Sequence, residues 1–269
     1  MTNNRSVHFQ TCVGVFQGGG CRAAAYVGAV QIAQERGVHF SSLAGTSAGA
    51  IVAALLGAGA NASQLQEYIK QLDFISLLSK PEWTGFRPLA RAFGRVLKLS
   101  PFPQHRVMGY ALSHQGQYSS KLIEDWLESK LQILLPDADR PIRFSALPIA
   151  TSVVAGDLLS RRAKIWSSDL TPQDEVKRAV RASCSIPFFF QPVDRRYIDG
   201  GVVSNLPTFV HTFSPPSGTP LARRILAFAL YGNDQPPDGW NAEVLVKLLA
   251  DTVVDGNQDI QGQLVEDVY

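Results

Sequence analysis

The chain has 269 residues, of which 45% are hydrophobic and 18% charged, and its formal net charge is +2. Disordered chains combine low hydrophobicity with high charge, so this composition excludes a disordered protein. The small net charge supplies no strong field to recruit nucleic acid, and we expect no nucleic-acid partner. The length suits one large domain with a substantial core, and no linker or internal repeat divides it. We therefore expect residues 1–269 to form a single domain.

Features that direct a chain into or across a membrane are missing from the sequence. The longest run of small and apolar residues, 48–60, is interrupted by glycines and falls short of the about 20 residues that a spanning helix needs. Residues 1–10 are polar and lack the apolar centre of a signal peptide. The chain has an odd number of widely spaced cysteines, Cys12, Cys21 and Cys184. This pattern is typical of free thiols rather than of disulfides or a zinc site. These features predict a cytoplasmic protein.

Two strand–turn–helix units are predicted in the first 60 residues. A β-type run at Thr11–Phe16 ends in a glycine cluster, and a helix over 23–35 follows, with Gly37 as its stop signal. A second run at 41–44 leads into another glycine-containing turn and an alanine-rich helix that ends near residue 57. This alternation favours a parallel sheet covered by helices.

The remainder of the chain continues with helical and extended patterns. Further helices are predicted over 61–72, 121–134, 171–183 and 242–254, with another capped start at Ser204. Strands are predicted over 142–154, 158–166 and 225–230, with a hairpin turn at Gly156 and Asp157. The aromatic run at 188–190 is expected to pack in the core, and a role in lining an acyl groove is the alternative.

Residues 73–116 form an irregular insertion in which basic and aromatic residues are interleaved. From Lys80 to Arg106 there are six basic residues and one acid, Glu82. Solvated charges on an ordinary surface insertion explain this composition. The alternative is a lid or a patch that contacts an anionic membrane, where each basic residue contributes about 1 kcal/mol.

Ser47 lies at the centre of a Gly45-x-Ser47-x-Gly49 turn between a predicted strand and a predicted helix. The two glycines permit a sharp turn with the serine at its tip. Such a turn places the hydroxyl at the carboxyl edge of the sheet, where open α/β folds bind ligands. It also aims the first amides of the following helix at any negative charge that develops there. The alternative is a structural turn with a helix-capping serine.

A glycine cluster follows the first predicted strand: Gly18, Gly19, Gly20, Cys21 and Arg22. A dinucleotide-binding loop has similar spacing, but no Asp or Glu occurs between Glu35 and Glu67, where that fold needs a ribose ligand. Two interpretations remain. The backbone amides of the cluster form an oxyanion hole, or the cluster is a structural turn. Arg22 either fixes the loop or binds an anionic headgroup.

A nucleophilic serine needs a base, and the chain offers two candidates. Asp199 begins an Asp199-Gly200-Gly201 turn after an extended approach. An aspartate becomes a useful base when burial raises its pKa, although Asp-Gly-Gly also occurs as a simple turn. His211 follows Asp199 and allows the Ser–Asp–His order of an α/β-hydrolase, but it lies in no motif.

Together these motifs resemble the patatin-like phospholipases. That family combines a Gly-Gly-Gly-x-Arg loop, a G-x-S-x-G turn and a D-G-G turn in the order found here. The segment 181–192, which precedes the D-G-G turn, is also similar to the family. The resemblance runs from about Val13 to Pro207, apart from the insertion at 73–116.

The resemblance implies a three-layer α/β/α sandwich around a mostly parallel sheet. It implies that Ser47 is the nucleophile, that Asp199 is the base and that the glycine-loop amides hold the oxyanion. The reaction would be hydrolysis of acyl esters of membrane phospholipids through an acyl-enzyme, with no metal or organic cofactor. Peripheral contact with the membrane and an activating ligand or protein are further expectations. The alternatives are a soluble esterase or thioesterase with a triad that includes His211, and a non-catalytic module that binds lipid or another anion.

Overall fold

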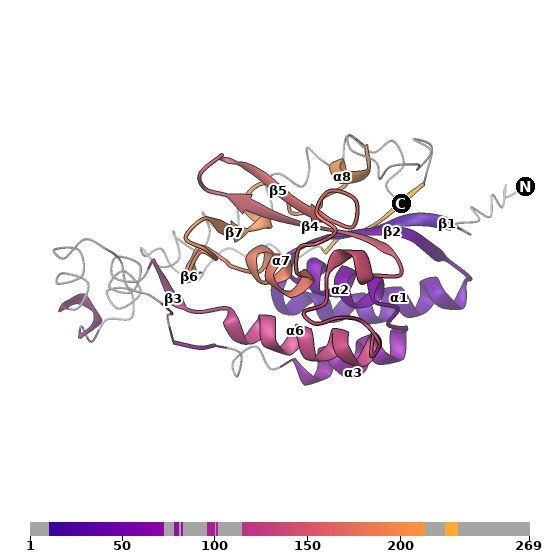
Figure 1. Ribbon diagram of the computed structural model, residues 1–269, viewed down its shortest axis with the longest axis horizontal. Helices are drawn as coiled ribbons and strands as arrows, with labels where there is room; N and C mark the ends of the chain where they lie inside the picture. Colours follow the sequence, from indigo (N-terminus) through magenta and orange to yellow (C-terminus); the bar gives the residue numbers. More distant parts are fainter. Residues whose placement is uncertain are drawn as a thin grey trace, which may run out of the picture.

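The computed structural model of the protein describes residues 11–72, 78–80, 82, 96–99, 101, 115–212 and 224–230. The central sheet contains β1 (Thr11–Phe16), β2 (His39–Thr46), β4 (Ala150–Asp157), β5 (Arg162–Ser167), β7 (Tyr197–Asp199) and β8 (Ile225–Phe228). Its strand order is β5-β4-β2-β1-β8, and β7 pairs with β4 outside this path (Figure 1). A separate parallel pair is formed by β3 (Gly116–Tyr118) and β6 (Phe188–Phe190).

The sheet is mostly parallel, as the sequence predicted. Strand β1 pairs in parallel with β2 and β8, and β2 pairs in parallel with β4. Strands β5 and β7 are antiparallel to β4. The protein therefore has a mixed α/β fold with a central sheet flanked by helices.

The helices are α1 (Ala25–Glu35), α2 (Ala48–Gly57), α3 (Ala62–Gln71), α6 (Lys121–Leu134), α7 (Val176–Ser183) and α8 (Phe209–Thr212). Figure 1 shows α8 above the sheet and the other five below it. The larger core cluster joins these five helices to Phe16 of β1, and the smaller cluster joins α8 to Val13 and Val15. Alternating side chains of β1 thus enter both layers, as expected for a strand buried on both faces.

Helix α2 lies at the centre of the larger layer, and each of its residues is buried. Small residues allow it to approach the sheet closely. A Cβ atom on Gly57 would lie 2.2 Å from Thr151 Oγ1 in β4. None of the helices in the described part of the chain is both long enough and apolar enough to span a bilayer.

The hairpin turn between β4 and β5 was predicted wrongly. Gly156 and Asp157 belong to β4, and residues 158–161 form the turn. The Asp157 carboxylate accepts a hydrogen bond from the Leu159 amide at 3.0 Å and another from Ser160 Oγ at 2.8 Å. These bonds close the turn after Asp157 rather than at it.

Three element starts also differ from the predictions. The strand predicted over 142–154 begins only at Ala150, because Phe144–Ala146 form a 3₁₀ helix and Pro148 has no amide hydrogen to donate to the sheet. The helix predicted over 171–183 begins at Val176, after a turn in which the Asp174 amide donates to the Thr171 carbonyl at 3.0 Å. Ser204 does not start a helix, since its amide donates to the Gly200 carbonyl at 2.8 Å and α8 begins at Phe209.

The aromatic run in β6 is only partly in the core. Phe190 is buried, whereas Phe188 and Phe189 are exposed. The Phe189 ring contacts Tyr118 of β3 with centroids 5.1 Å apart. The prediction of core packing is therefore wrong for the first two phenylalanines. The helix predicted over 242–254 and most of the insertion at 73–116 lie outside the described residues.

Helix α6 offers a matched test of this core. Leu131 is fully buried, whereas Ile133 on the same helix is 62% exposed. Truncating a buried side chain costs about 2–5 kcal/mol of the free energy of unfolding, and a surface change costs about 0.5 kcal/mol or less. We expect Leu131→Ala to lower the urea denaturation midpoint clearly and Ile133→Ala to change it little. Equal midpoints for the two variants would contradict the placement of α6.

Candidate active site

Strands β2 and β7 pair with the same edge of β4, and this pairing positions the residues of the site. Thr46, the last residue of β2, pairs with Val154 of β4. Asp199, the last residue of β7, pairs with the next residue, Ala155. Because β2 is parallel and β7 antiparallel to β4, the two strands run toward each other and their last residues meet. Ser47 directly follows Thr46, so the sheet brings it to Asp199.

Ser47 forms the sharp turn that the sequence predicted. Its φ of 53° and ψ of −125° lie in a region that residues with a side chain seldom occupy. The flanking positions have no room for a side chain. A Cβ atom on Gly45 would lie 2.3 Å from the Gly49 carbonyl oxygen. A Cβ atom on Gly49 would lie 2.2 Å from the Phe16 carbonyl oxygen. Glycine at both positions therefore lets the strand turn directly into α2.

Ser183 holds the turn from the adjacent helix α7. The Ser47 amide donates to Ser183 Oγ at 2.8 Å, and Ser183 Oγ donates to the Val154 carbonyl at 2.5 Å. The sequence alone assigns no role to Ser183, although this residue lies in the segment 181–192 that resembles the family. Nothing in its spacing distinguishes a serine at a helix end, so only the fold reveals this contact.

Asp199 is buried, with 3% of its surface exposed. Its Oδ1 accepts a hydrogen bond from the Gly201 amide at 2.7 Å, and its own amide donates to the Ser185 carbonyl at 2.8 Å. Its Oδ2 has no hydrogen-bond partner among the described residues. Gly200 must be small, because a Cβ atom there would lie 2.1 Å from the Val154 carbonyl oxygen.

The surroundings of Asp199 make its carboxylate more basic. Burial raises the pKa of Asp199 to about 6, while the nearby Ser47 hydroxyl and the Gly201 amide act in the opposite direction and lower it. Within the described residues, no cation forms an ion pair with this carboxyl group. At neutral pH the group is mostly ionised, yet it binds a proton far more readily than an exposed aspartate.

The glycine loop lies against the same turn. A Cβ atom on Gly18 would lie 3.1 Å from Ser47 Cβ and 2.4 Å from Asn205 Oδ1. The Gly18 amide donates to the Asn205 carbonyl at 3.0 Å, so it is already engaged. Asn205 itself is buried in the segment that follows Asp199. The loop is thus fastened to the chain on the far side of the site.

Three amides of the loop remain available. Residues Gly20–Ala24 form a 3₁₀ helix, and the Arg22 amide donates to the Gly19 carbonyl at 3.1 Å. In the described part of the structure, the amides of Gly19, Gly20 and Cys21 donate to no protein acceptor. Cys21 and Arg22 are exposed. Amides in this state can bind a negatively charged oxygen.

A network of charged side chains supports the segment that contacts Asp199. Arg181 of α7 pairs with Glu124 of α6 at 2.9 Å and also contacts Glu82, which comes from the insertion. Its Nε donates to Ser120 Oγ at 3.3 Å, and Ser120 Oγ lies 2.9 Å from Ser185 Oγ. The Ser185 carbonyl accepts the hydrogen bond from the Asp199 amide, so this network stiffens one wall of the site.

His211 lies on the other side of the sheet. It is on α8, where the neighbouring Val210 belongs to the smaller core cluster. None of the hydrogen bonds of Ser47 or Asp199 described above involves this histidine. Among the described residues, no three His, Cys, Asp or Glu side chains gather as a metal site requires.

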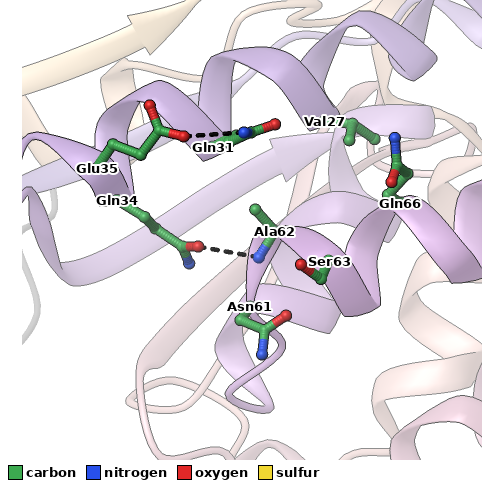
Figure 2. A pocket seen from close by; sticks show the side chains of 8 residues that line it. All are labelled: Val27, Gln31, Gln34, Glu35, Asn61, Ala62, Ser63 and Gln66. Carbon is green, nitrogen blue, oxygen red and sulfur yellow. Dashed lines mark hydrogen bonds between the residues drawn. The ribbon is translucent and has the colours of Figure 1, made fainter.

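A hollow between α1 and α3 is unrelated to this site. Its volume is about 340 Å³, and Figure 2 shows the side chains that line it. Gln31 donates to Glu35 at 2.9 Å, and Gln34 accepts from the Ala62 amide at 2.9 Å. Its polar groups thus stabilise the two helices, and it contains no pair of side chains suited to acyl transfer.

Comparison with known proteins identifies the family. A family model for patatin-like phospholipases matches residues 14–210, which include the glycine loop and both turns. The chain belongs to this family. The resemblance predicted from the three motifs is therefore confirmed.

Two bacterial relatives match most of this chain but only part of their own length. An uncharacterized protein of Bacillus subtilis, YqhO, is 31% identical over 229 residues, which cover 78% of this chain and 71% of that protein. An uncharacterized NTE family protein of Mycobacterium tuberculosis is 26% identical over 222 residues, which cover 81% of this chain and 49% of that protein. The chain thus spans about half the length of the mycobacterial relative.

Two solved structures are also similar to this patatin-family chain. VipD of Legionella pneumophila has 21% identity and a TM-score of 0.46, over 73% of this chain and 47% of that chain. ExoU of Pseudomonas aeruginosa, in complex with SpcU, has 20% identity and a TM-score of 0.43, over 69% of this chain and 40% of that chain.

The raised pKa of Asp199 predicts how stability depends on pH. The folded-state pKa of about 6 exceeds the ordinary 3.8, so the folded protein holds this proton more tightly than the unfolded chain. Ionisation of Asp199 therefore lowers the free energy of unfolding as pH rises between these two values. In Asp199→Asn this loss disappears, while the side-chain oxygen that accepts from Gly201 is kept.

We expect the stability of Asp199→Asn relative to wild type to rise by about 2 kcal/mol between about pH 4.5 and about pH 7.5. Urea denaturation of both proteins at the two pH values measures this change. A stability difference that is the same at both values would contradict a buried carboxyl group with a raised pKa.

Proposed function

We propose that the protein hydrolyses acyl esters of phospholipids with a dyad of Ser47 and Asp199. The observation that carries this proposal is the meeting of β2 and β7 on one edge of β4. It sets a serine at a strained turn beside a buried carboxylate whose pKa burial raises to about 6. Membership of the patatin-like phospholipase family supports the substrate class.

In the first half of the reaction, Asp199 takes the proton of Ser47 as Oγ attacks the ester carbonyl carbon. The carbonyl oxygen becomes an oxyanion, which the unengaged amides of Gly19, Gly20 and Cys21 stabilise. One such donor is worth about 100-fold to 1000-fold in rate. The tetrahedral intermediate then collapses, the C–O bond to the lysolipid breaks, and Asp199 returns the proton to the departing alcohol.

In the second half, water attacks the acyl group on Ser47 and gives its proton to Asp199. Collapse of this second intermediate breaks the bond to Oγ, which regains the proton, and a fatty acid leaves. The same carboxylate therefore acts as base and acid in both halves, and no metal or organic cofactor enters the scheme. A pKa near the working pH suits both duties.

The two alternatives are less well supported. A triad needs His211 to face Asp199, but none of the described hydrogen bonds of Asp199 goes to a histidine. A purely binding module would not need a strained nucleophile turn or a buried carboxylate beside it, because each costs about 1–3 kcal/mol or more of stability.

We further propose that the protein contacts membranes peripherally through the tip of the β4–β5 hairpin. Asp199 pairs with β4 only a few residues before this tip, so the tip projects from the edge of the sheet that holds the site. Leu158 and Leu159 are exposed there, Leu159 by 70%. Arg161 and Arg162, which follow, are exposed cations. Exposed leucines beside arginines suit an anionic bilayer, which attracts the charges and buries the apolar groups.

The dyad is tested by fatty-acid release from phospholipid vesicles. We expect Ser47→Ala and Asp199→Asn each to lower the rate by about 100-fold or more, because each removes a group that acts on the reacting atoms. His211→Ala should retain activity. Circular dichroism of each variant checks that it is folded. A folded Ser47→Ala protein with wild-type release would overturn the proposal, and loss of release in folded His211→Ala would favour the triad.

The hairpin tip is tested by flotation with vesicles that contain phosphatidylserine. Changing both Leu158 and Leu159 to serine should reduce the bound fraction about tenfold or more, since two apolar side chains no longer enter the bilayer. Leu170→Ser is the matched control, because this leucine is 62% exposed but lies beyond the other end of β5. Similar binding by the double variant and the control would contradict a docking role for the tip.

A further inference from the structure

An apolar cavity of about 200 Å³ lies beside the glycine loop. Gly20 and Cys21 of the loop and Ala48 of α2 line one part of it, and Ile51, Ile69 and Leu72 line another. No described side chain in its lining is charged, and its polar groups are the Cys21 thiol and the backbone. The cavity is therefore lined by two residues of the glycine loop and by the residue that directly follows Ser47.

We propose that this cavity receives the acyl chain of the substrate and limits its preferred length. The proposal rests on the dyad at Ser47, because the ester must be placed by the nucleophile and the loop amides. An ester whose carbonyl oxygen lies at the amides of Gly20 and Cys21 has its acyl chain next to the cavity that these residues line. Apolar cavities stay dry and accept apolar groups, so an alkyl chain is the ligand that this lining suits.

The hollow between α1 and α3 does not suit the chain. Gln31 and Glu35 in its lining are hydrogen-bonded to each other, and Gln34 accepts a hydrogen bond from the Ala62 amide of α3 (Figure 2). An alkyl chain placed there would remove polar groups from water without compensation. That hollow also contains none of the glycine-loop residues. The apolar cavity is thus distinguished both by its chemistry and by its contact with the loop.

The size of the cavity sets the length of chain that it holds. An apolar cavity of about 150 Å³ accommodates benzene, which has six carbons, so one of about 200 Å³ holds about eight. Each methylene buried in such a space favours binding about fourfold. A longer chain gains nothing from carbons beyond the cavity. The structure therefore predicts that kcat/KM rises with chain length only up to a medium chain and then stays level. The shortest chain that reaches this level is called the optimum below.

The optimum is measured as kcat/KM for 4-nitrophenyl esters with acyl chains of about four to sixteen carbons. For wild type we expect a rise of about fourfold per methylene up to about eight carbons and then a plateau. Ala24→Leu adds three carbons to the lining and should shorten the optimum by about three carbons. Leu72→Ala removes three and should lengthen it by a similar amount. Ser63→Leu, in the polar hollow of Figure 2, is the matched control and should keep the wild-type profile.

A second measurement does not depend on turnover. Cys21 is exposed at the cavity, whereas Cys12 and Cys184 are buried and their thiol pKa values are raised by burial, so iodoacetamide should modify Cys21 first. We expect octanoate to slow the modification of Cys21 severalfold and acetate to leave its rate unchanged. The same two results are expected in the Ser47→Ala variant. Ala24→Leu should weaken the protection by octanoate.

The two measurements separate the cavity from the dyad. Hydrolysis with a chain-length profile that Ala24→Leu and Leu72→Ala leave unchanged would overturn the role of the cavity and leave the dyad in place. Failure of octanoate to protect Cys21 from iodoacetamide would likewise overturn the role of the cavity. Protection without hydrolysis of any ester or phospholipid would overturn the proposed function and support the cavity as an acyl-binding site.

Discussion

The pairing of two oppositely directed strands with one edge of β4 is the constraint on which the site depends. β2 ends at Thr46 and β7 ends at Asp199, and their partners Val154 and Ala155 are adjacent in β4. The distance between the serine turn and the carboxylate is therefore set by backbone hydrogen bonds rather than by flexible side chains. Sites built on such rigid elements hold their geometry more precisely than sites built on loops alone.

This arrangement stores unfavourable free energy that the rest of the fold offsets. Ser47 has a strained backbone, and Asp199 holds a carboxylate in a buried position. The fully buried helix α2 follows the strained turn directly, and Ser183 ties the turn to the carbonyl of Val154. The packing of α2 and α7 against the sheet thus keeps the strained serine turn next to the buried carboxylate.

The sequence predicted the parts of the site that depend on local chemistry. Glycines at 45, 49 and 200 are required by close backbone approaches, and they marked both turns correctly. It did not predict contacts that depend on distant segments meeting. No local sequence pattern marks Ser183 as a contact of the serine turn. The Asn205 carbonyl accepts a hydrogen bond from the Gly18 amide because the fold brings the segment after β7 next to the glycine loop. The hairpin turn was misplaced for a different, local reason, since the hydrogen bonds from Leu159 and Ser160 to the Asp157 carboxylate outweigh the preference of Gly156 for turns.

Whether Asp199 activates Ser47 is measured most directly with a fluorophosphonate, which reacts with activated serines. We expect labelling of wild type at Ser47, located by peptide mass mapping, with a rate that rises as pH passes through about 6, the pKa of Asp199. Asp199→Asn should be labelled at least about 100-fold more slowly than wild type, and His211→Ala should be labelled at the wild-type rate. Labelling of folded Asp199→Asn at the wild-type rate would contradict a dyad of Ser47 and Asp199.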